Sequence, residues 1–178
     1  MDGTIEVLTS PGSGTEVIIR LKFKLADEDE IRRSKDSKTG ISDKQVDFTG
    51  KRILLVEDNA INMEIAKMIL TQTGFIVDTA KDGKIALDMV SASKPGDYDL
   101  ILMDIQMPVM DGYEATKAIR SLENKALAEI PIVAMTANAF AEDVKAAHDA
   151  GMQAHIAKPV DVTLMKKTLA DILFGEKK

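Results

Sequence analysis

Five side chains that can bind a metal ion or move charge come directly at or after the ends of apolar runs in this sequence. Glu57 and Asp58 follow one run, Asp104 follows a second, Thr136 ends a third, and Lys158 follows a short fourth. If these runs are parallel strands, their carboxyl ends lie at one edge of a sheet, which is where such sheets bind ligands. We therefore expect the five side chains to lie close together.

Three carboxylates at one edge require a counter-charge. Two carboxylates about 4 Å apart repel by roughly 4 kcal/mol at an effective dielectric constant of about 20. Lys158 can offset only part of that charge, and a site of oxygen ligands alone suits Mg²⁺ or Mn²⁺. The predicted metal ligands are Glu57, Asp58, Asp104 and the backbone carbonyl of Gln106.

Such a site is equipped for phosphoryl transfer. Asp104 follows the central apolar run and is the expected nucleophile, which would form an acyl phosphate. Lys158 and the metal ion can draw charge from the phosphoryl oxygens, and Thr136 can donate a hydrogen bond to another. We predict catalytic roles for Asp104, Lys158 and Thr136.

Composition excludes several other classes of site. The 178 residues carry a net charge of −6, which argues against a nucleic-acid partner or attraction to an anionic membrane. The chain has no cysteine, which excludes disulfides and thiolate metal sites, and its two histidines are too few for a His-rich zinc site. No apolar run approaches the roughly 20 residues of a membrane span, and we expect no direct membrane contact.

Residues 50–175 show the alternation of strands and helices that is typical of an α/β fold. Predicted strands cover residues 53–56, 75–80, 100–103, 132–135 and 155–157, and predicted helices cover residues 60–72, 84–92, 113–122, 143–150 and 162–173. This pattern predicts a doubly wound, five-stranded parallel sheet with five helices covering its two faces.

The first 49 residues have a different composition. Residues 1–24 predict a β-hairpin, because apolar residues alternate with polar ones on both sides of the turn sequence Pro11-Gly12-Ser13-Gly14. Residues 25–49 predict a charged linker, since 12 of the residues 25–48 are Asp, Glu, Lys or Arg. A short charged helix over residues 28–34 is the alternative.

Several motifs together resemble response-regulator receiver domains. They are Val56-Glu57-Asp58-Asn59 with Asn62, the stretch from Met103 to Gly112, Thr136-Ala137 and Lys158-Pro159. The resemblance covers about residues 51–174 and is closest to receivers fused to hybrid sensor histidine kinases. It implies a flavodoxin-like strand order of 2-1-3-4-5 and a cis Lys158-Pro159 peptide bond.

The resemblance also implies the function. A receiver accepts a phosphoryl group from phosphohistidine in a Mg²⁺-dependent reaction, here onto Asp104, and relays or hydrolyses it. Its expected partners are a histidine kinase domain, a histidine phosphotransfer protein, or both. On the first predicted helix, Ile61, Ile65 and Met68 mark where such a partner would dock, with core packing as an equal alternative.

Further residues gain roles through the resemblance. Gln106, Ala137 and Asn138 flank the site and would modulate the loss of the phosphoryl group. Thr136 and His155 would switch conformation on phosphorylation, although His155 is otherwise an exposed strand residue.

Residues 1–24 resemble the last hairpin of a histidine-kinase ATP-binding domain. We therefore expect the chain to be the C-terminal part of a hybrid histidine kinase, with the kinase machinery upstream and absent from this sequence. A cytoplasmic location and a monomer or weak dimer are expected.

Three rival functions make different demands on the sequence. A phosphatase with an aspartyl nucleophile would need an acid two residues after Asp104, where the chain has Gln106. A flavodoxin-like electron carrier would need a phosphate-binding loop after the first strand, where Glu57-Asp58 would repel phosphate. A receiver-like module that no longer accepts phosphoryl groups remains as the alternative.

Overall fold

The computed structural model describes residues 3–10, 12, 14–21, 46–137 and 141–175. The chain divides into two compact units, Met1–Lys44 and Gln45–Lys178. Most of the predicted linker, and the alternative helix over residues 28–34, lie outside the described residues. The predicted domain boundaries stay predictions.

The first unit contains the predicted β-hairpin. Strand β1 (Gly3–Ser10) pairs antiparallel with β2 (Gly14–Leu21), so that Val7 lies opposite Val17 and Ile5 opposite Ile19. Gly12 and Gly14 have φ angles of 81° and 90° at the turn, which glycine adopts readily. The four apolar side chains of the paired positions are 55–69% exposed, and a two-stranded sheet alone is marginally stable in water.

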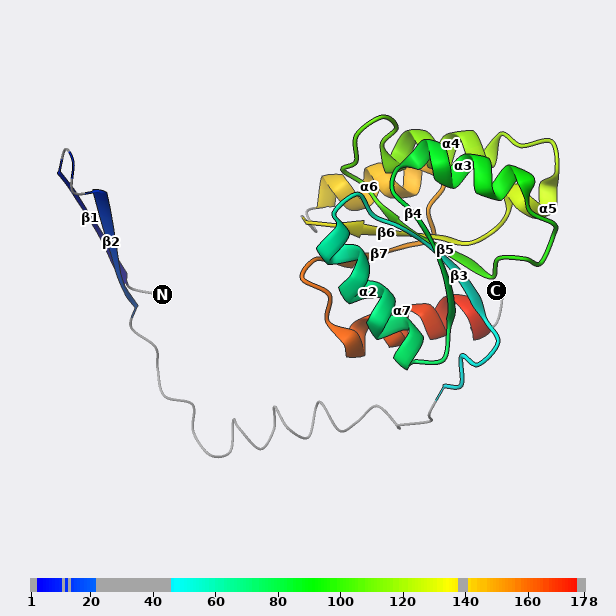
Figure 1. Cartoon of the computed structure of the whole chain (residues 1–178), viewed down its shortest axis with the longest axis horizontal. Helices are drawn as coiled ribbons and strands as arrows, with labels where there is room; N and C mark the ends of the chain where they lie inside the picture. Colours follow the sequence, from blue (N-terminus) through cyan, green and yellow to red (C-terminus); the bar gives the residue numbers. More distant parts are fainter. Residues whose placement is uncertain (1–2, 11, 13, 22–45, 138–140, 176–178) are drawn as a thin grey trace. The chain divides into compact units, whose positions relative to one another are not determined.

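The second unit is built on a five-stranded parallel sheet of order β4-β3-β5-β6-β7 (Figure 1). Its strands are β3 (Arg52–Val56), β4 (Ile76–Ala80), β5 (Leu100–Asp104), β6 (Ile132–Thr136) and β7 (Ala154–Ala157). Counted along this unit, the order is 2-1-3-4-5, so the predicted fold is confirmed. β5, the middle strand, is buried along its whole length.

Six helices are present among the described residues of this unit, one more than predicted. They are α2 (Ala60–Gln72), α3 (Gly83–Ala92), α4 (Gly112–Arg120), α5 (Lys125–Ala128), α6 (Ala141–Ala150) and α7 (Val162–Phe174). The additional helix, α5, is a single turn capped by the Asn124 side chain, which accepts from the Ala126 N–H, and it buries Leu127 and Ala128. No helix in the described ranges is long and apolar enough to cross a membrane.

Successive strand residues point to opposite faces of the sheet and enter two separate cores. Leu54 and Ile101 belong to the core under α3, α4, α5 and α6, whereas Leu55 and Leu102 belong to the core under α2 and α7 (Figure 1). Burying each such side chain stabilises the fold by about 1.5–3 kcal/mol. The two cores hold the central strands rigidly and fix the positions at which their carboxyl ends stop.

Aromatic side chains close the amino end of the sheet. Phe48 is 2% exposed, and its ring stacks on Phe75 with 4.5 Å between centroids. Phe174, at the end of α7, also packs against Phe48, with 5.8 Å between the ring centroids. Beside them, Lys51 Nζ lies 2.9 Å from Asp99 Oδ1, and Asp99 Oδ2 accepts from the Arg52 N–H at 2.8 Å. Phe48 therefore ties the segment preceding β3 to the core.

Arg120 likewise ties chain segments to the fold, here the segments that precede β6 and β7. Its guanidinium donates to the carbonyl oxygens of Gly151 at 3.0 Å, Ala128 at 2.5 Å and Ile130 at 2.9 Å. Burial lowers its pKa from the usual value, against the attraction of nearby Glu129. The side chain thus joins α4 to the backbone of two segments, residues 128–130 before β6 and Gly151 before β7.

Candidate functional site

The carboxyl end of the sheet brings the predicted acidic and basic side chains together. Lys158 Nζ lies 2.6 Å from Glu57 Oε2 and 2.7 Å from Asp104 Oδ2. Glu57 and Asp104 are 2% and 5% exposed, whereas the adjacent Asp58 is exposed. One ammonium group thus bridges two buried carboxylates that lie far apart in the sequence.

Burial and pairing act against each other on these groups. Burial raises the pKa of the Asp104 carboxyl above its usual value, although Lys158 and the Gln106 backbone N–H both favour the carboxylate. Burial favours the neutral amine of Lys158, but the hydrogen bonds to Asp104 and Glu57 and the negative charges of these two groups together outweigh it and raise the pKa of this lysine. Asp104 is therefore a poorly solvated carboxylate next to a firmly protonated ammonium group.

The acidic cluster suits a hard divalent cation. One carboxylate oxygen from each of Glu57, Asp58 and Asp104 lies within 4.8 Å of the others. Carboxylate oxygens are the ligands that Mg²⁺ and Mn²⁺ prefer, and Mg²⁺ usually keeps several waters, for which the exposure of Asp58 leaves room. These residues fit the predicted metal ion.

Lys158 and Thr136 are positioned by neighbouring strands. Thr136 ends β6 and pairs with Ala157 of β7, and the Lys158 N–H donates to the Thr136 carbonyl at 2.8 Å. The Lys158-Pro159 peptide is cis, as the resemblance implied. Thr136 is half-buried and Ala137 is exposed, and both line the cleft that contains Glu57, Asp104 and Lys158.

The loop after Asp104 packs tightly against the backbone of the strand. At Gly112 a Cβ atom would clash with the Asp104 carbonyl oxygen, and the Gly112 N–H donates to the Ile105 carbonyl at 3.0 Å. Asp111 and Glu114 form a capping box that starts α4 at this point. At the outer tip of the loop, Val109 has a φ of 70°, a region that β-branched residues rarely adopt.

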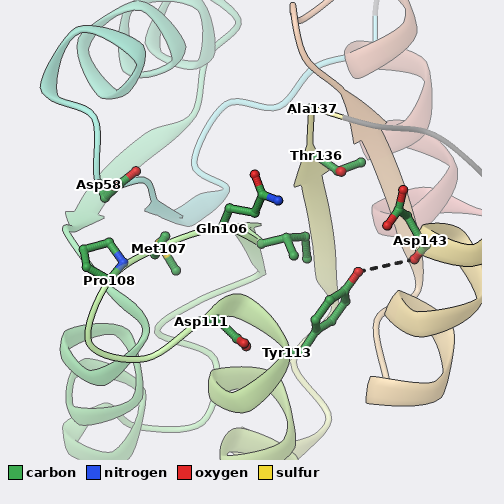
Figure 2. Close-up of a pocket in the computed structure, with 10 residues that line it drawn as sticks. Asp58, Gln106, Met107, Pro108, Asp111, Tyr113, Thr136, Ala137 and Asp143 are labelled. Atoms are coloured by element: carbon green, nitrogen blue, oxygen red, sulfur yellow. Dashed lines mark hydrogen bonds between the residues drawn. The ribbon is translucent and has the colours of Figure 1, made fainter.

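Two adjoining clefts open at this end of the sheet. The first, of about 300 Å³, is lined by Glu57, Asp104 and Lys158 among others. The second, of about 510 Å³, lies beyond Gln106 and Thr136 and is bordered by Tyr113, whose hydroxyl donates to the Asp143 carbonyl at 3.5 Å (Figure 2). Sequence reasoning did not identify the second cleft, because α4 and α6 meet only in the folded chain.

The remaining predicted site residues divide into three cases. Gln106 is exposed at the border of both clefts. His155 is half-buried on β7, in register with Ala134 rather than at the acidic cluster. Asn138 lies outside the described residues, so its modulating role stays a prediction.

Asn62 makes a contact at the site that sequence reasoning did not predict. Its side-chain Nδ2 donates to Glu57 Oε1 at 3.0 Å. Asn62 belongs to the motif that begins at Val56, and its place in the first turn of α2, shortly after Glu57, is the sequence signal for this contact.

The family model of the response regulator receiver domain matches residues 53–170, which include this whole edge of the sheet. The chain belongs to this family. Receiver domains are the phosphoacceptor parts of two-component signalling, and the site described above lies within the matched region.

Known proteins with similar receiver domains include hybrid histidine kinases. The receiver is 39% identical over 140 residues to hybrid signal transduction histidine kinase I of Dictyostelium discoideum, a match that covers 75% of this chain and 8% of that protein. The chain therefore spans a small part of this relative.

Two solved structures show the same fold as this receiver. The receiver domain of a sensor histidine kinase from Pseudomonas aeruginosa PAO1, with a magnesium ion coordinated in its active site cleft, is 38% identical, with a TM-score of 0.63 over 70% of this chain and 98% of that chain. The Saccharomyces cerevisiae receiver domain of Ssk1, crystallised with the histidine phosphotransfer protein Ypd1, is 31% identical, with a TM-score of 0.63 over 69% and 88% of the two chains.

Proposed function

We propose that Asp104 accepts a phosphoryl group from a phosphohistidine of a partner protein. The observation that carries this proposal is the buried Asp104 carboxylate at the end of β5, with Lys158 Nζ 2.7 Å from its Oδ2 and two further acids beside it. An Asp104 oxygen attacks phosphorus, the phosphorus–nitrogen bond breaks, and the imidazole leaves and takes up a proton. The product is an aspartyl phosphate that is relayed or hydrolysed.

Glu57, Asp58, Asp104 and the backbone carbonyl of Gln106 would hold Mg²⁺ or Mn²⁺. When bound, the ion supplies positive charge to the phosphoryl oxygens and offsets the repulsion among the acids. The magnesium ion in the similar Pseudomonas receiver and the acidic cluster of this chain support this assignment.

Lys158 and Thr136 act on the phosphoryl group once it arrives. Lys158 moves from its pairing with Asp104 and Glu57 to a phosphoryl oxygen, and the Thr136 hydroxyl donates to another. These inward movements shift the equilibrium between the unphosphorylated and phosphorylated conformations, and His155 on β7 changes its conformation with them. Gln106, Ala137 and Asn138 control how water reaches the acyl phosphate.

The partner docks on an exposed apolar stripe of α2, formed by Ile61, Ile65 and Met68. These side chains are 71%, 49% and 54% exposed, which favours docking over the alternative of core packing. The yeast receiver in complex with a histidine phosphotransfer protein supports a partner of this class, and a histidine kinase domain is the other candidate.

The whole protein is a hybrid histidine kinase in the cytoplasm, in which the receiver follows the kinase machinery. The similar Dictyostelium discoideum protein is a hybrid signal transduction histidine kinase, and the exposed apolar face of β1 and β2 fits the last hairpin of an ATP-binding domain. The receiver acts as a monomer or a weak dimer.

Intact-mass measurement after incubation with acetyl phosphate tests the acceptor. We expect one phosphoryl adduct with Mg²⁺, none without it, and none in Asp104→Asn. Asp88→Asn, on the exposed side of α3, is the matched control and keeps the adduct. If the wild-type chain binds Mg²⁺ but gains no adduct from acetyl phosphate or from a phosphorylated phosphotransfer protein, it is an interaction module that does not accept phosphoryl groups.

A further inference from the structure

The two adjacent acids Glu57 and Asp58 are held very differently. Glu57 is 2% exposed and each of its oxygens has its own partner, Asn62 Nδ2 at 3.0 Å from Oε1 and Lys158 Nζ at 2.6 Å from Oε2. Asp58 is exposed. The orientation of the buried acid is therefore fixed by two side chains, whereas its neighbour lies in the solvent-facing part of the cleft.

The position of Asn62 is set by the start of α2. Asn59 caps this helix, and its Oδ1 accepts from the backbone N–H groups of Ile61 and Asn62 at 3.0 and 3.1 Å. The backbone of Asn62 is thus fixed in the first turn, and its side-chain amide reaches back to the carboxylate at the end of β3. A neutral donor on a rigid element can hold that carboxylate without competing for its charge.

The two partners of Glu57 differ in whether they must move during the proposed reaction. Lys158 also contacts Asp104 at 2.7 Å, and it must leave Glu57 when it turns to a phosphoryl oxygen. Asn62 has no such second task among the hydrogen bonds that the structure shows for its side chain. It therefore remains on Glu57 Oε1 while Oε2 becomes free for a metal ion or a metal-bound water.

We propose that Asn62 is a positioning residue that orients Glu57 for Mg²⁺ binding, with Lys158 either present or withdrawn. This inference rests on the proposed phosphoacceptor function. Without the amide, the carboxylate turns about its terminal torsion and pairs more fully with Lys158, which opposes both metal binding and release of the lysine.

The test is calorimetric titration of the full chain with Mg²⁺ in the absence of any phosphodonor. Asn62→Ala and the near-isosteric Asn62→Leu both lack the donor, and we expect each to raise the Mg²⁺ dissociation constant about 10-fold. The matched control is Glu64→Gln, an exposed change on the same helix, which leaves the dissociation constant unchanged. Thermal unfolding without Mg²⁺ verifies that the variants are folded.

Phosphorylation by acetyl phosphate gives a second readout. In Asn62→Ala the Mg²⁺ concentration for half-maximal rate rises by the same factor, while the rate at saturating Mg²⁺ returns to that of the wild type. A merely structural role would lower the rate at every Mg²⁺ concentration, and that result overturns the inference.

The outcomes separate the two proposals. Equal Mg²⁺ affinity in the wild type and both Asn62 variants overturns the positioning role alone. Absence of Mg²⁺ binding by the wild type overturns both the role and the metal site. Retention of the phosphoryl adduct in Asp104→Asn overturns the proposed acceptor, whereas the comparison of Mg²⁺ affinities still tests the role of Asn62.

Discussion

The two ends of the parallel sheet are built from different chemistry. At the carboxyl end, two buried carboxylates share the ammonium group of Lys158, and burial raises the pKa of Asp104. At the amino end, Phe48 and Phe75 stack, and Asp99 is paired with Lys51 and a backbone N–H. Charge is concentrated and poorly solvated at one end, and it is dispersed at the other.

This difference indicates that the groups that mainly stabilise the fold lie at the amino end of the sheet, whereas the reactive groups lie at its carboxyl end. Among the described residues, no buried side-chain nitrogen or oxygen lacks a hydrogen-bond partner, so both ends are satisfied in the resting state. Only at the carboxyl end does that satisfaction depend on a lysine that the reaction must move. Changes at the two ends should therefore be distinguishable by experiment.

Phe48→Ala should have the largest effect, and on stability alone. Removing a buried aromatic side chain lowers the free energy of unfolding by about 3–5 kcal/mol. Denaturant unfolding measures the loss, and the folded fraction should accept phosphoryl groups at the wild-type rate. Phe174→Ala is the comparison, with a smaller loss because that ring is 49% exposed. Equal losses in the two variants would contradict the proposed anchoring of Phe48.

Lys158→Met should instead act on the rate of phosphoryl acceptance. Loss of a positioned positive charge lowers the rate of phosphoryl acceptance by about 10²–10³. The matched control is Lys51→Met, since Lys51 also pairs with an aspartate, at 2.9 Å, but at the amino end. Rates followed by intact mass at saturating Mg²⁺ should differ sharply between the two variants. A similar rate in both would remove the distinction between the ends.

Much of this arrangement is predictable from the sequence because it depends on local pattern. The buried runs around Leu54 and Leu102 identify strands, and a carboxylate at the carboxyl end of such a strand, as Asp104 is, lies at the functional edge. The confirmed strand order then brings Lys158 to the same place. Spacing and strand order together are enough to bring Glu57, Asp104 and Lys158 to one edge of the sheet.

Other features depend on partners that the local pattern does not reveal. Phe48 follows a highly charged stretch, and it becomes a core residue only through contacts made in the folded chain, among them those with Phe75 and Phe174. Helix α5 is a single turn, which is too short for the helical spacing of apolar residues to be recognised in the sequence. The contact of Asn62 with Glu57 depends on the angle at which α2 leaves β3.

Mg²⁺ should stabilise the fold through the carboxyl end only. At one hundred times its dissociation constant, a ligand that binds only the folded state adds about 2.7 kcal/mol to the free energy of unfolding. We expect this increment in the wild type and in Asp99→Asn, and its loss in Asp58→Asn, whose stability without metal is unchanged because Asp58 is exposed. Chemical denaturation with Mg²⁺ or with EDTA provides the measurement; an increment that survives in Asp58→Asn would argue against that ligand.

Val109→Gly should give a small gain in stability. Val109 is 84% exposed and has a φ of 70°, which is unfavourable for an L-residue, whereas glycine adopts it freely. After the entropic cost of glycine, the expected gain is roughly 0.5–1 kcal/mol. Val46→Gly, exposed but without a positive φ, should show no gain in the same unfolding assay. A loss in Val109→Gly would mean that the valine side chain contributes contacts.

The smallest effect is expected in alkaline solution. Burial, with the nearby Asp78, raises the pKa of Tyr98 above its usual value. The folded state therefore keeps the phenol proton longer than the unfolded state, and stability present below pH 10 is lost as pH rises through the folded pKa. Tyr98→Phe should lack this part of the alkaline loss in unfolding measured between neutral pH and pH values above that of the free phenol. Parallel pH profiles of wild type and variant would refute it.

Gly112 limits what laboratory evolution can do with this loop. A library that randomises residues 106–112 would return only glycine at its inner end, because any side chain there would clash with the carbonyl oxygen of Asp104. Pro108 and Val109, which are exposed at the tip, are free to vary. New partner preferences can therefore be selected at the tip while the acceptor stays where it is.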